Sequence, residues 1–245
     1  LSGAGLVRIY TEESNRAILQ ELLPEAVMTT YSLDETESFE ELPDLLEWAD
    51  VLCIGCGLGM GPHSEELLKK VLENNKTPAV IDADGLNLLA KTDEWGIEQI
   101  RMNPSGYVLT PHMKEMSRLT GWSIDTIMED RFQALDQIIK QSGPDTKSSI
   151  ICVLKDSRTV VAQTNRQRFV NLAGNNSMAK GGSGDVLAGT IAGLLAQHMA
   201  PFEATTVGVF LHACGGDEAK KSKGSYSVLA RDLIQGMADA MKNAK

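Results

Sequence analysis

"GNNSMAKGGSGDVLAGTIAGLLAQ" (residues 174–197) joins a glycine-rich segment directly to an apolar helical pattern. Glycine lacks a Cβ, so its backbone adopts conformations closed to other residues and its amides can approach a ligand closely. The start of the following helix adds unpaired N–H groups and a partial positive charge. The segment therefore predicts an anion hole suited to phosphate. We assign that hole to Gly181, Gly182, Ser183 and Gly184.

Asp185 lies beside this hole, in the first turn of a helix expected over 183–198. A carboxylate there can accept a hydroxyl proton while the hole stabilises a phosphoryl group in transfer. The alternative is an ordinary helix start with an acidic first-turn residue, but three glycines in four positions exceed what a helix cap requires. The segment is neither a P-loop, since no Gly-Lys-Ser/Thr follows the glycines, nor a dinucleotide fingerprint, since no strand precedes it. We therefore predict that Asp185 is the catalytic base.

The rest of the chain alternates short apolar runs with helical patterns, which is typical of a mainly parallel sheet covered by helices on both faces. One segment, "SIICVLKDSRTVVAQ" (149–163), predicts an antiparallel hairpin at one edge of that sheet. The loop at 143–148 is too short for a domain linker, so we expect one α/β domain over 1–245. Expected strands are 5–10, 50–54, 78–83, 106–110, 149–155 and 158–163, and expected helices are 12–22, 63–74, 85–90, 111–120, 123–141, 183–198, 201–221 and 227–241.

Composition narrows the class of protein and of partner. The 245 residues include 33 acidic and 23 basic ones, for a net charge of -10, which disfavours a nucleic-acid or anionic-membrane partner. Four cysteines do not make a disulfide scaffold, and no uncharged run approaches the roughly 20 residues that span a bilayer. We expect a cytoplasmic protein. The chain opens with "LSGAGLVRIY", which we interpret as a fragment lacking its opening strand.

Four unusual segments follow expected strands, where ligands gather in open α/β sheets. They are "GCGLGMG" (55–61), "DADGLN" (82–87), "TPHMKE" (110–115) and "KDSRT" (155–159). The first follows a strand expected to be buried and completes a Cys-x-x-Cys pair, Cys53 and Cys56. A redox or zinc function is disfavoured because Cys53 belongs to an apolar strand and there is no second pair.

Local signals also suggest structural roles for several polar residues. Asp84 is the natural cap of the helix at 85–90, although a supporting role in the site stays open. Thr110 can cap the next helix and Pro111 suits its first position. His112 and Glu115, three residues apart, would share one helical face.

The long motif "NLAGNNSMAKGGSGDVLAGTIAGLLAQ" (171–197) resembles the signature of the ADP/ATP-dependent NAD(P)H-hydrate dehydratases, which belong to the ribokinase-like superfamily. Asn171, Gly174, Asn175 and Met178 all match fixed positions of that signature. "VIDADGLNLLA", "VLTPHMKEMSRLTG" and "SGAGLVRIYT" resemble further family segments in the same order, so the resemblance covers essentially the whole chain. The family's opening strand and its glycine-containing loop are absent.

The resemblance implies a ribokinase-like fold and a repair reaction. ADP or ATP would phosphorylate the ring hydroxyl of hydrated NADH or NADPH, and loss of phosphate would restore the reduced nicotinamide. Asp185 would contact the hydrated ring and act as base, with Gly184 beside the nucleotide phosphate. Gly57, Gly59 and His112 would bind the substrate. The predicted supporting residues are Asn171, Asn175 and Asp84.

The resemblance also places the adenine nucleotide across the expected hairpin. The predicted nucleotide-binding residues are Lys155, Asp156, Ser157, Arg158, Thr159 and Gly184. A divalent ion such as Mg²⁺ would screen the phosphates, and no side chains are assigned as metal ligands. The family tends toward homotetramers. Two positions depart from its pattern: Cys56 replaces a usual proline, and Asp156 replaces a usual glycine and brings a carboxylate near phosphates.

Two other functions stay open on sequence grounds. One is a ribokinase-like kinase acting on a vitamin precursor of the hydroxyethylthiazole or hydroxymethylpyrimidine type, which would leave a stable phosphate ester. The other is a nucleotide-sensing or scaffold protein with a decayed site, favoured only by the departures at Cys56 and Asp156. Retention of Asp185 and the loop glycines speaks against it.

Overall fold

A computed structural model describes residues 2–33, 39–92, 96–102, 106–140, 150–164 and 167–243. The loop expected at 143–148 lies outside these residues. Within them, no helix is long and apolar enough to cross a membrane.

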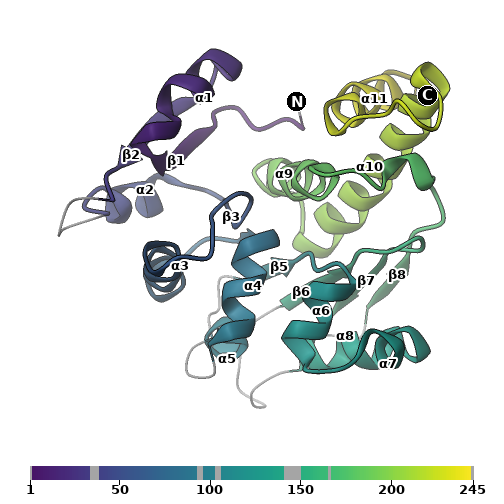
Figure 1. The fold of residues 1–245 in the computed structure, drawn as a ribbon, viewed down its shortest axis with the longest axis horizontal. Helices are drawn as coiled ribbons and strands as arrows, with labels where there is room; N and C mark the ends of the chain where they lie inside the picture. The colour runs from purple at the N-terminus through teal and green to yellow at the C-terminus, as the bar shows by residue number, and fades with distance from the viewer. Residues whose placement is uncertain are drawn as a thin grey trace.

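A six-stranded sheet forms the centre of the fold, with its strands in sequence order (Figure 1). The first four strands are parallel, and the last three pair antiparallel with one another. The predicted parallel sheet with an antiparallel hairpin at one edge is therefore confirmed, and β8 adds a strand that the sequence analysis missed. The strands are β3 Leu52–Ile54, β4 Ala79–Ile81, β5 Tyr107–Leu109, β6 Ile150–Leu154, β7 Val160–Gln163 and β8 Arg168–Val170.

Helices cover both faces of this sheet, as predicted. Alternate strand residues point to opposite faces, so Ile81 and Leu109 pack with one layer of helices while Val80 and Val108 pack with the other. The first layer comprises α3 Pro62–Asn74, α4 Ala83–Lys91, α5 Gly96–Met102, α6 Met113–Thr120, α7 Ile124–Glu129 and α8 Arg131–Ile139. The second comprises α9 Ser183–Leu195 and α10 Pro201–Lys223, with α11 Ala230–Asn243 packed against both (Figure 1).

The N-terminal segment forms a second, two-stranded sheet rather than a strand of the central one. In it β1 Arg8–Glu12 pairs in parallel with β2 Val27–Tyr31. The short helices η1 Glu13–Asn15 and α1 Arg16–Leu22 connect the two strands, and α2 Leu42–Trp48 follows. Tyr10 and Tyr31 make an edge-to-face contact with ring centroids 5.0 Å apart. The prediction that the first strand joins the parallel sheet was wrong, and β2, with two threonines and no long apolar run, was not predicted.

Three local predictions also differ from the structure. The single helix expected over 123–141 is two, because the Asp130 side chain accepts from Gln133 N–H (2.9 Å) and starts α8 as a new helix. The strand expected to be buried at 50–54 is β3, at the edge of the described sheet, where Cys53 is exposed. A short helix, η2 Asn176–Met178, precedes α9.

Candidate active site

The N-terminus of α9 is built to receive an anion. Gly182 is the N-cap residue, in the left-handed conformation (φ 83°) that favours glycine. Ser183 and Val186 N–H groups donate to Lys180 (3.2 Å) and Gly182 (3.1 Å) carbonyls. The hydrogen bonds of the described residues leave the N–H groups of Gly184 and Asp185 without an acceptor, as expected at a helix start. These two amides are free for a ligand oxygen.

A buried histidine lies directly behind this helix start. His212 of α10 is 8% exposed, and its Nε2 lies 3.3 Å from the Ser183 hydroxyl. Burial lowers the pKa of His212 to about 4, so the ring is neutral at physiological pH. His212 therefore supports the first residue of α9 without adding charge to the anion hole.

Lys155 faces the helix start from the end of β6. Its Nζ lies 2.6 Å from Asp82 Oδ1 and 3.9 Å from Glu115 Oε2. Asp82 and Glu115 are both buried, with 1% and 4% exposed, so this pair of carboxylates needs a cation beside it. A Cβ on Gly184 would stand 3.0 Å from Lys155 Nζ, so the ammonium group packs closely against the backbone at this glycine. Lys155 is thus within reach of a phosphate held by α9.

His112 caps α6, which corrects the prediction that Thr110 is the cap and Pro111 the first helical residue. His112 Nδ1 accepts from Lys114 and Glu115 N–H, and the Glu115 carboxylate accepts from His112 N–H (2.8 Å). The shared face of His112 and Glu115 is confirmed. Burial and the nearby Lys155 lower the pKa of His112, and burial raises the pKa of Glu115. The His112 side chain is 47% exposed, which leaves it accessible to a substrate.

The glycine loop after β3 is held in place by Asp84. Its Oδ2 accepts from Gly59 N–H (2.9 Å), and the Ser64 hydroxyl donates to the Leu58 carbonyl (2.7 Å). The N-cap residue of α4 is Asp82, so the prediction of Asp84 as the cap of a helix at 85–90 was wrong. Asp84 instead connects two of the predicted ligand segments, because its helix starts beside the loop that carries Gly57 and Gly59.

In the β6–β7 turn, the Asp156 carboxylate, which would be unfavourable near phosphates, has a cationic partner. Its carboxylate lies 2.7 Å from Arg131 at the start of α8, so the negative charge is paired. The Thr159 hydroxyl donates to the Asp156 carbonyl (3.2 Å) and closes the turn. Ser157 and Arg158 are exposed. The turn can therefore meet a nucleotide without an unpaired carboxylate.

The segment before α9 is anchored from α10. Asp217 accepts from the Asn175 side chain (2.7 Å) and from Gly174 N–H (3.2 Å). Asn171 N–H donates to the Thr159 carbonyl (2.9 Å), and its side chain donates to the Ala173 carbonyl (3.0 Å). In these contacts Asn171 and Asn175 shape the loop that leads to the anion hole. Asp217 was not predicted, since only the fold brings it to that loop.

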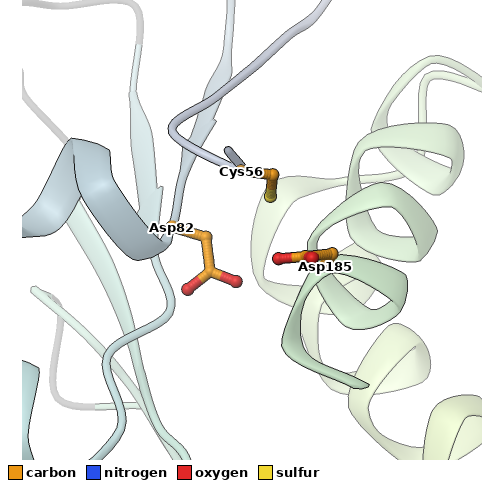
Figure 2. A group of neighbouring side chains, drawn as sticks. All are labelled: Cys56, Asp82 and Asp185. Atoms are coloured by element: carbon orange, nitrogen blue, oxygen red, sulfur yellow. The ribbon is translucent and has the colours of Figure 1, made fainter. Parts of the chain in front are cut away.

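Cys56, Asp82 and Asp185 converge from three separate elements (Figure 2). One ligand atom of each lies within 4.8 Å of the others. Cys56 comes from the loop after β3, Asp82 from the end of β4 and Asp185 from the first turn of α9. Interaction with Cys53, burial and the two carboxylates raise the pKa of the Cys56 thiol, so it is not a thiolate nucleophile in this state.

Comparison with known proteins identifies the family of this chain. The family model for NAD(P)H-hydrate dehydratase matches residues 1–238. The chain belongs to the NAD(P)H-hydrate dehydratase family. The ADP-dependent (S)-NAD(P)H-hydrate dehydratase of Neisseria meningitidis serogroup B is 34% identical over 228 residues, which cover 91% of this chain and 73% of the relative.

Other relatives are longer. The bifunctional NAD(P)H-hydrate repair enzyme Nnr of Moorella thermoacetica is 36% identical over 99% of this chain, but the chain spans only 45% of that enzyme.

Two solved structures have the same fold over 98% of this chain. A ribokinase-like superfamily protein of Enterococcus faecalis has a TM-score of 0.79, 31% identity and 78% of its length covered. The ADP/ATP-dependent NAD(P)H-hydrate dehydratase of Bacillus subtilis, co-crystallised with ATP/Mg²⁺, has a TM-score of 0.77, 25% identity and 79% covered.

The structure therefore brings most of the predicted site residues together at the carboxyl ends of the parallel strands. Lys155, Gly184 and Asp185 lie around Asp82. His112 lies on the same side because its capping partner Glu115 is close to Lys155. The loop of Gly57 and Gly59 is held there by Asp84. The sequence analysis gave no site role to Asp82, Glu115 or His212. The position of Asp82 at a strand end was the signal available, whereas Glu115 and His212 lie within helices and gave none. Their ligand-facing contacts needed the tertiary structure.

Proposed function

We propose that this chain uses ADP or ATP to convert NAD(P)H hydrate back to NAD(P)H, by phosphorylating the ring hydroxyl and releasing phosphate. The observation that carries this proposal is the position of Asp185 beside two free backbone amides at the start of α9. A phosphoryl transfer needs a site for the negative charge and a base for the attacking hydroxyl, and this helix start offers both. Membership of the NAD(P)H-hydrate dehydratase family supports the choice of substrate.

In this proposal the amides of Gly184 and Asp185 bind the phosphoryl group that is transferred. The Asp185 carboxylate accepts the proton of the ring hydroxyl as the oxygen attacks phosphorus, and the nucleotide leaves with one phosphate fewer. Lys155 is close enough to Gly184 to balance the charge of a bound phosphate. In the second half of the reaction the phosphate group leaves one ring carbon and the neighbouring carbon loses a proton to solvent, and the C–H electron pair restores the double bond of the reduced nicotinamide.

Mg²⁺ fits the same site. Asp82 Oδ2 is buried without a hydrogen-bond partner among the described residues, and the Asp185 carboxylate lies nearby. Carboxylate oxygens together with phosphate oxygens are the ligands that Mg²⁺ prefers. Bound there, the ion would neutralise charge on the transferred phosphoryl group. The two aspartates would hold it, with the nucleotide as the remaining ligand.

Different elements would bind the adenine nucleotide and the substrate. We place the nucleotide along the β6–β7 turn at 155–159, where Arg131 pairs with Asp156. We place the hydrated nicotinamide between the loop of Gly57 and Gly59 and the exposed ring of His112. Both ligands then meet at the N-terminus of α9, where their reacting atoms must come together.

The test is to incubate the protein with chemically prepared NADH hydrate, Mg²⁺ and either ADP or ATP, and to follow the return of reduced-nicotinamide absorbance. We expect recovery together with release of one inorganic phosphate per NADH formed. Parallel reactions with the two nucleotides identify the donor. A stable phosphate ester without recovered absorbance would overturn the dehydratase proposal in favour of a small-molecule kinase, and absence of nucleotide binding would favour a protein with a decayed site.

A cytoplasmic location and a homotetramer remain predictions of the sequence analysis. The four cysteines are free, which agrees with a reducing compartment. Analytical ultracentrifugation of the purified chain would measure its oligomeric state.

A further inference from the structure

The cluster of Cys56, Asp82 and Asp185 includes an atom that the proposed reaction does not use. The reaction needs the two carboxylates, but it assigns no part to the Cys56 sulfur, which lies within the same 4.8 Å group (Figure 2). Cys56 stands in the loop directly after β3, so the backbone delivers its thiol to the edge of the sheet where Asp82 ends β4. The cluster therefore combines one sulfur donor with two oxygen donors.

A second feature, the same one that supports Mg²⁺ in the proposed function, indicates that this cluster suits a cation. Asp82 is 1% exposed, and its Oδ1 is paired with Lys155 at 2.6 Å. Its Oδ2 is buried and has no hydrogen-bond partner among the described residues. This oxygen faces the start of α9, since it lies 3.3 Å from the point where a Cβ on Gly184 would stand. A buried carboxylate oxygen without a partner is costly unless a ligand completes it.

We propose that Cys56, Asp82 and Asp185 form a binding site for a thiophilic divalent cation of the Zn²⁺ class. A thiolate sulfur selects Zn²⁺ and related ions, whereas Mg²⁺ takes oxygen ligands and gains nothing from Cys56. Zn²⁺ accepts mixed sulfur and carboxylate ligands in a tetrahedral shell with bonds of about 2.0–2.3 Å. Ligand atoms in such a shell are roughly 3.3–3.8 Å apart, so the three side chains need to close by about 1 Å.

The arrangement has three protein ligands and leaves a fourth position for water or for an oxygen of another ligand. The Cys56 thiol gives up its proton on binding, as metal-bound cysteine does. Lys155 stays on the opposite oxygen of Asp82, outside the set of three ligand atoms. This site differs from the Cys-x-x-Cys zinc function that the sequence disfavoured, because the structure brings two aspartates rather than a second pair of cysteines to Cys56.

Binding is measured with the full chain in a non-thiol reductant, after treatment with a chelator. Titration with Co²⁺ should produce a thiolate-to-metal absorption band in the near ultraviolet, and competition against a chromophoric chelator should give one Zn²⁺ per chain. Cys56→Ser should abolish the band and weaken Zn²⁺ binding by more than the roughly 10–100-fold that loss of an outer-shell partner costs. Cys53→Ser, which removes the other exposed thiol of the pair, is the matched control and should bind like the wild type.

Three results would contradict the proposed Zn²⁺ site. A band and affinity that survive in Cys56→Ser, or their loss in Cys53→Ser to the same degree, would overturn this ligand set. So would the absence of any binding by the wild-type chain. Circular dichroism of both variants checks that they fold.

A second readout connects the site to catalysis, and this part rests on the proposed function. Zn²⁺ at this site would take the two aspartates that the proposed function assigns to Mg²⁺, so Zn²⁺ should inhibit the dehydratase reaction in competition with Mg²⁺. Each protein is compared with its own rate in Mg²⁺ alone, and Cys56→Ser should be less sensitive to Zn²⁺ than Cys53→Ser. Zn²⁺ binding without any dehydratase activity would contradict the proposed function alone. Activity without Cys56-dependent Zn²⁺ binding would contradict this inference alone.

Discussion

Asp185 is the residue on which the proposed chemistry depends, and its position follows from local sequence. The glycines before it bring the chain into the helix start, and the first turn of α9 places its carboxylate beside the free amides. Two buried residues complete its surroundings: Asp82 next to it and His212 behind the helix start. The predictions for single residues concern proton transfer by Asp185 and protonation of His212.

Replacing Asp185 by Asn should lower turnover by roughly 10²–10⁴-fold, the range expected for loss of a general base. Nucleotide affinity measured without Mg²⁺ should not fall, because the backbone amides stay in place and a negative charge near the phosphate is removed. Steady-state kinetics and isothermal titration calorimetry measure the two effects. Glu203→Gln is the matched control, since Glu203 is also an acidic first-turn residue but belongs to α10. Wild-type turnover in Asp185→Asn would remove Asp185 from the mechanism.

His212 should make the free energy of unfolding depend on pH. Its folded pKa is about 4, below the ordinary value of 6.5, because burial disfavours the charged ring. Between these values the unfolded chain binds more protons, so stability rises with pH. The contribution is fully present above about pH 6.5 and is lost as the pH falls toward 4, by up to about 3 kcal/mol.

Urea unfolding at several pH values from 4 to 7 measures this effect. The His212→Gln variant should lack it, so the stability difference between wild type and variant should shrink as the pH falls. Carboxylates that titrate in the same range act on both proteins and cancel in the difference. A difference that stays constant with pH would mean that His212 does not titrate as its burial requires.

At the scale of elements, the site is assembled by contacts between segments that the sequence shows only as separate strand ends. Arg131 connects α8 to the β6–β7 turn, Asp84 connects α4 to the glycine loop, and Asp217 connects α10 to the segment before α9. Each contact fixes a loop that the proposal assigns to a ligand. Removing one of them should therefore alter binding or stability locally.

The pair of Arg131 and Asp156 should control nucleotide affinity through charge. Arg131→Gln leaves the Asp156 carboxylate unpaired near the proposed phosphate site, and the nucleotide dissociation constant should rise by roughly threefold to tenfold. The double variant Arg131→Gln/Asp156→Asn should bind with near wild-type affinity because the carboxylate is gone. Calorimetry at low and high salt tests this, since screening should reduce the effect. Equal affinity for all three proteins would place the nucleotide away from this turn.

Asp217 should contribute to stability through the loop that it anchors. In Asp217→Ala, the Gly174 amide and the Asn175 side chain lose their acceptor, which should cost about 1–3 kcal/mol of unfolding free energy. Denaturant unfolding gives the value. Glu218→Gln is the control, because Glu218 pairs only with the exposed Lys221 in the described contacts and should change stability by less than about 0.5 kcal/mol. A similar loss in both variants would contradict the anchoring role.

At the scale of the molecule, the two layers of helices contribute different halves of the site. The layer with α4 and α6 supplies Asp82, Asp84 and His112, while the opposite layer supplies the start of α9. The site lies where both layers reach the carboxyl ends of the parallel strands, as is usual for open α/β sheets. A bound nucleotide would therefore connect segments that are far apart in the sequence.

Ligand binding should stabilise the whole fold. With Mg²⁺ and a nucleotide at 100 times its dissociation constant, the free energy of unfolding should rise by about 2.7 kcal/mol, because the folded chain alone binds. Thermal unfolding should show a midpoint that rises with nucleotide concentration, and a chelator should reduce the gain if Mg²⁺ is held between nucleotide and aspartates. An unchanged midpoint at saturating nucleotide would contradict nucleotide binding by this chain.

Much of the fold was accessible from the sequence because its signals are local. Apolar runs of strand length followed by helical periodicity are features of neighbouring residues, and they predicted the parallel sheet, its hairpin edge and the helices on both faces. The glycine-rich helix start was predictable for the same reason, since Gly182 and the first turn of α9 are adjacent in the chain. Where two local signals competed, as for the caps of α4 and α6, sequence alone chose the wrong residue.

Only the tertiary structure decided which distant charges meet. The pairs Lys155–Asp82 and Arg131–Asp156, and the cluster of Cys56, Asp82 and Asp185, join residues from separate elements. Their distances depend on how the strands order and how each helix packs, and periodicity carries no information on either. By itself the sequence determined the α/β class and the glycine-rich start of the helix that carries Asp185. The packing of the sheet determined which side chains surround it, because electrostatic contacts form between neighbours in space.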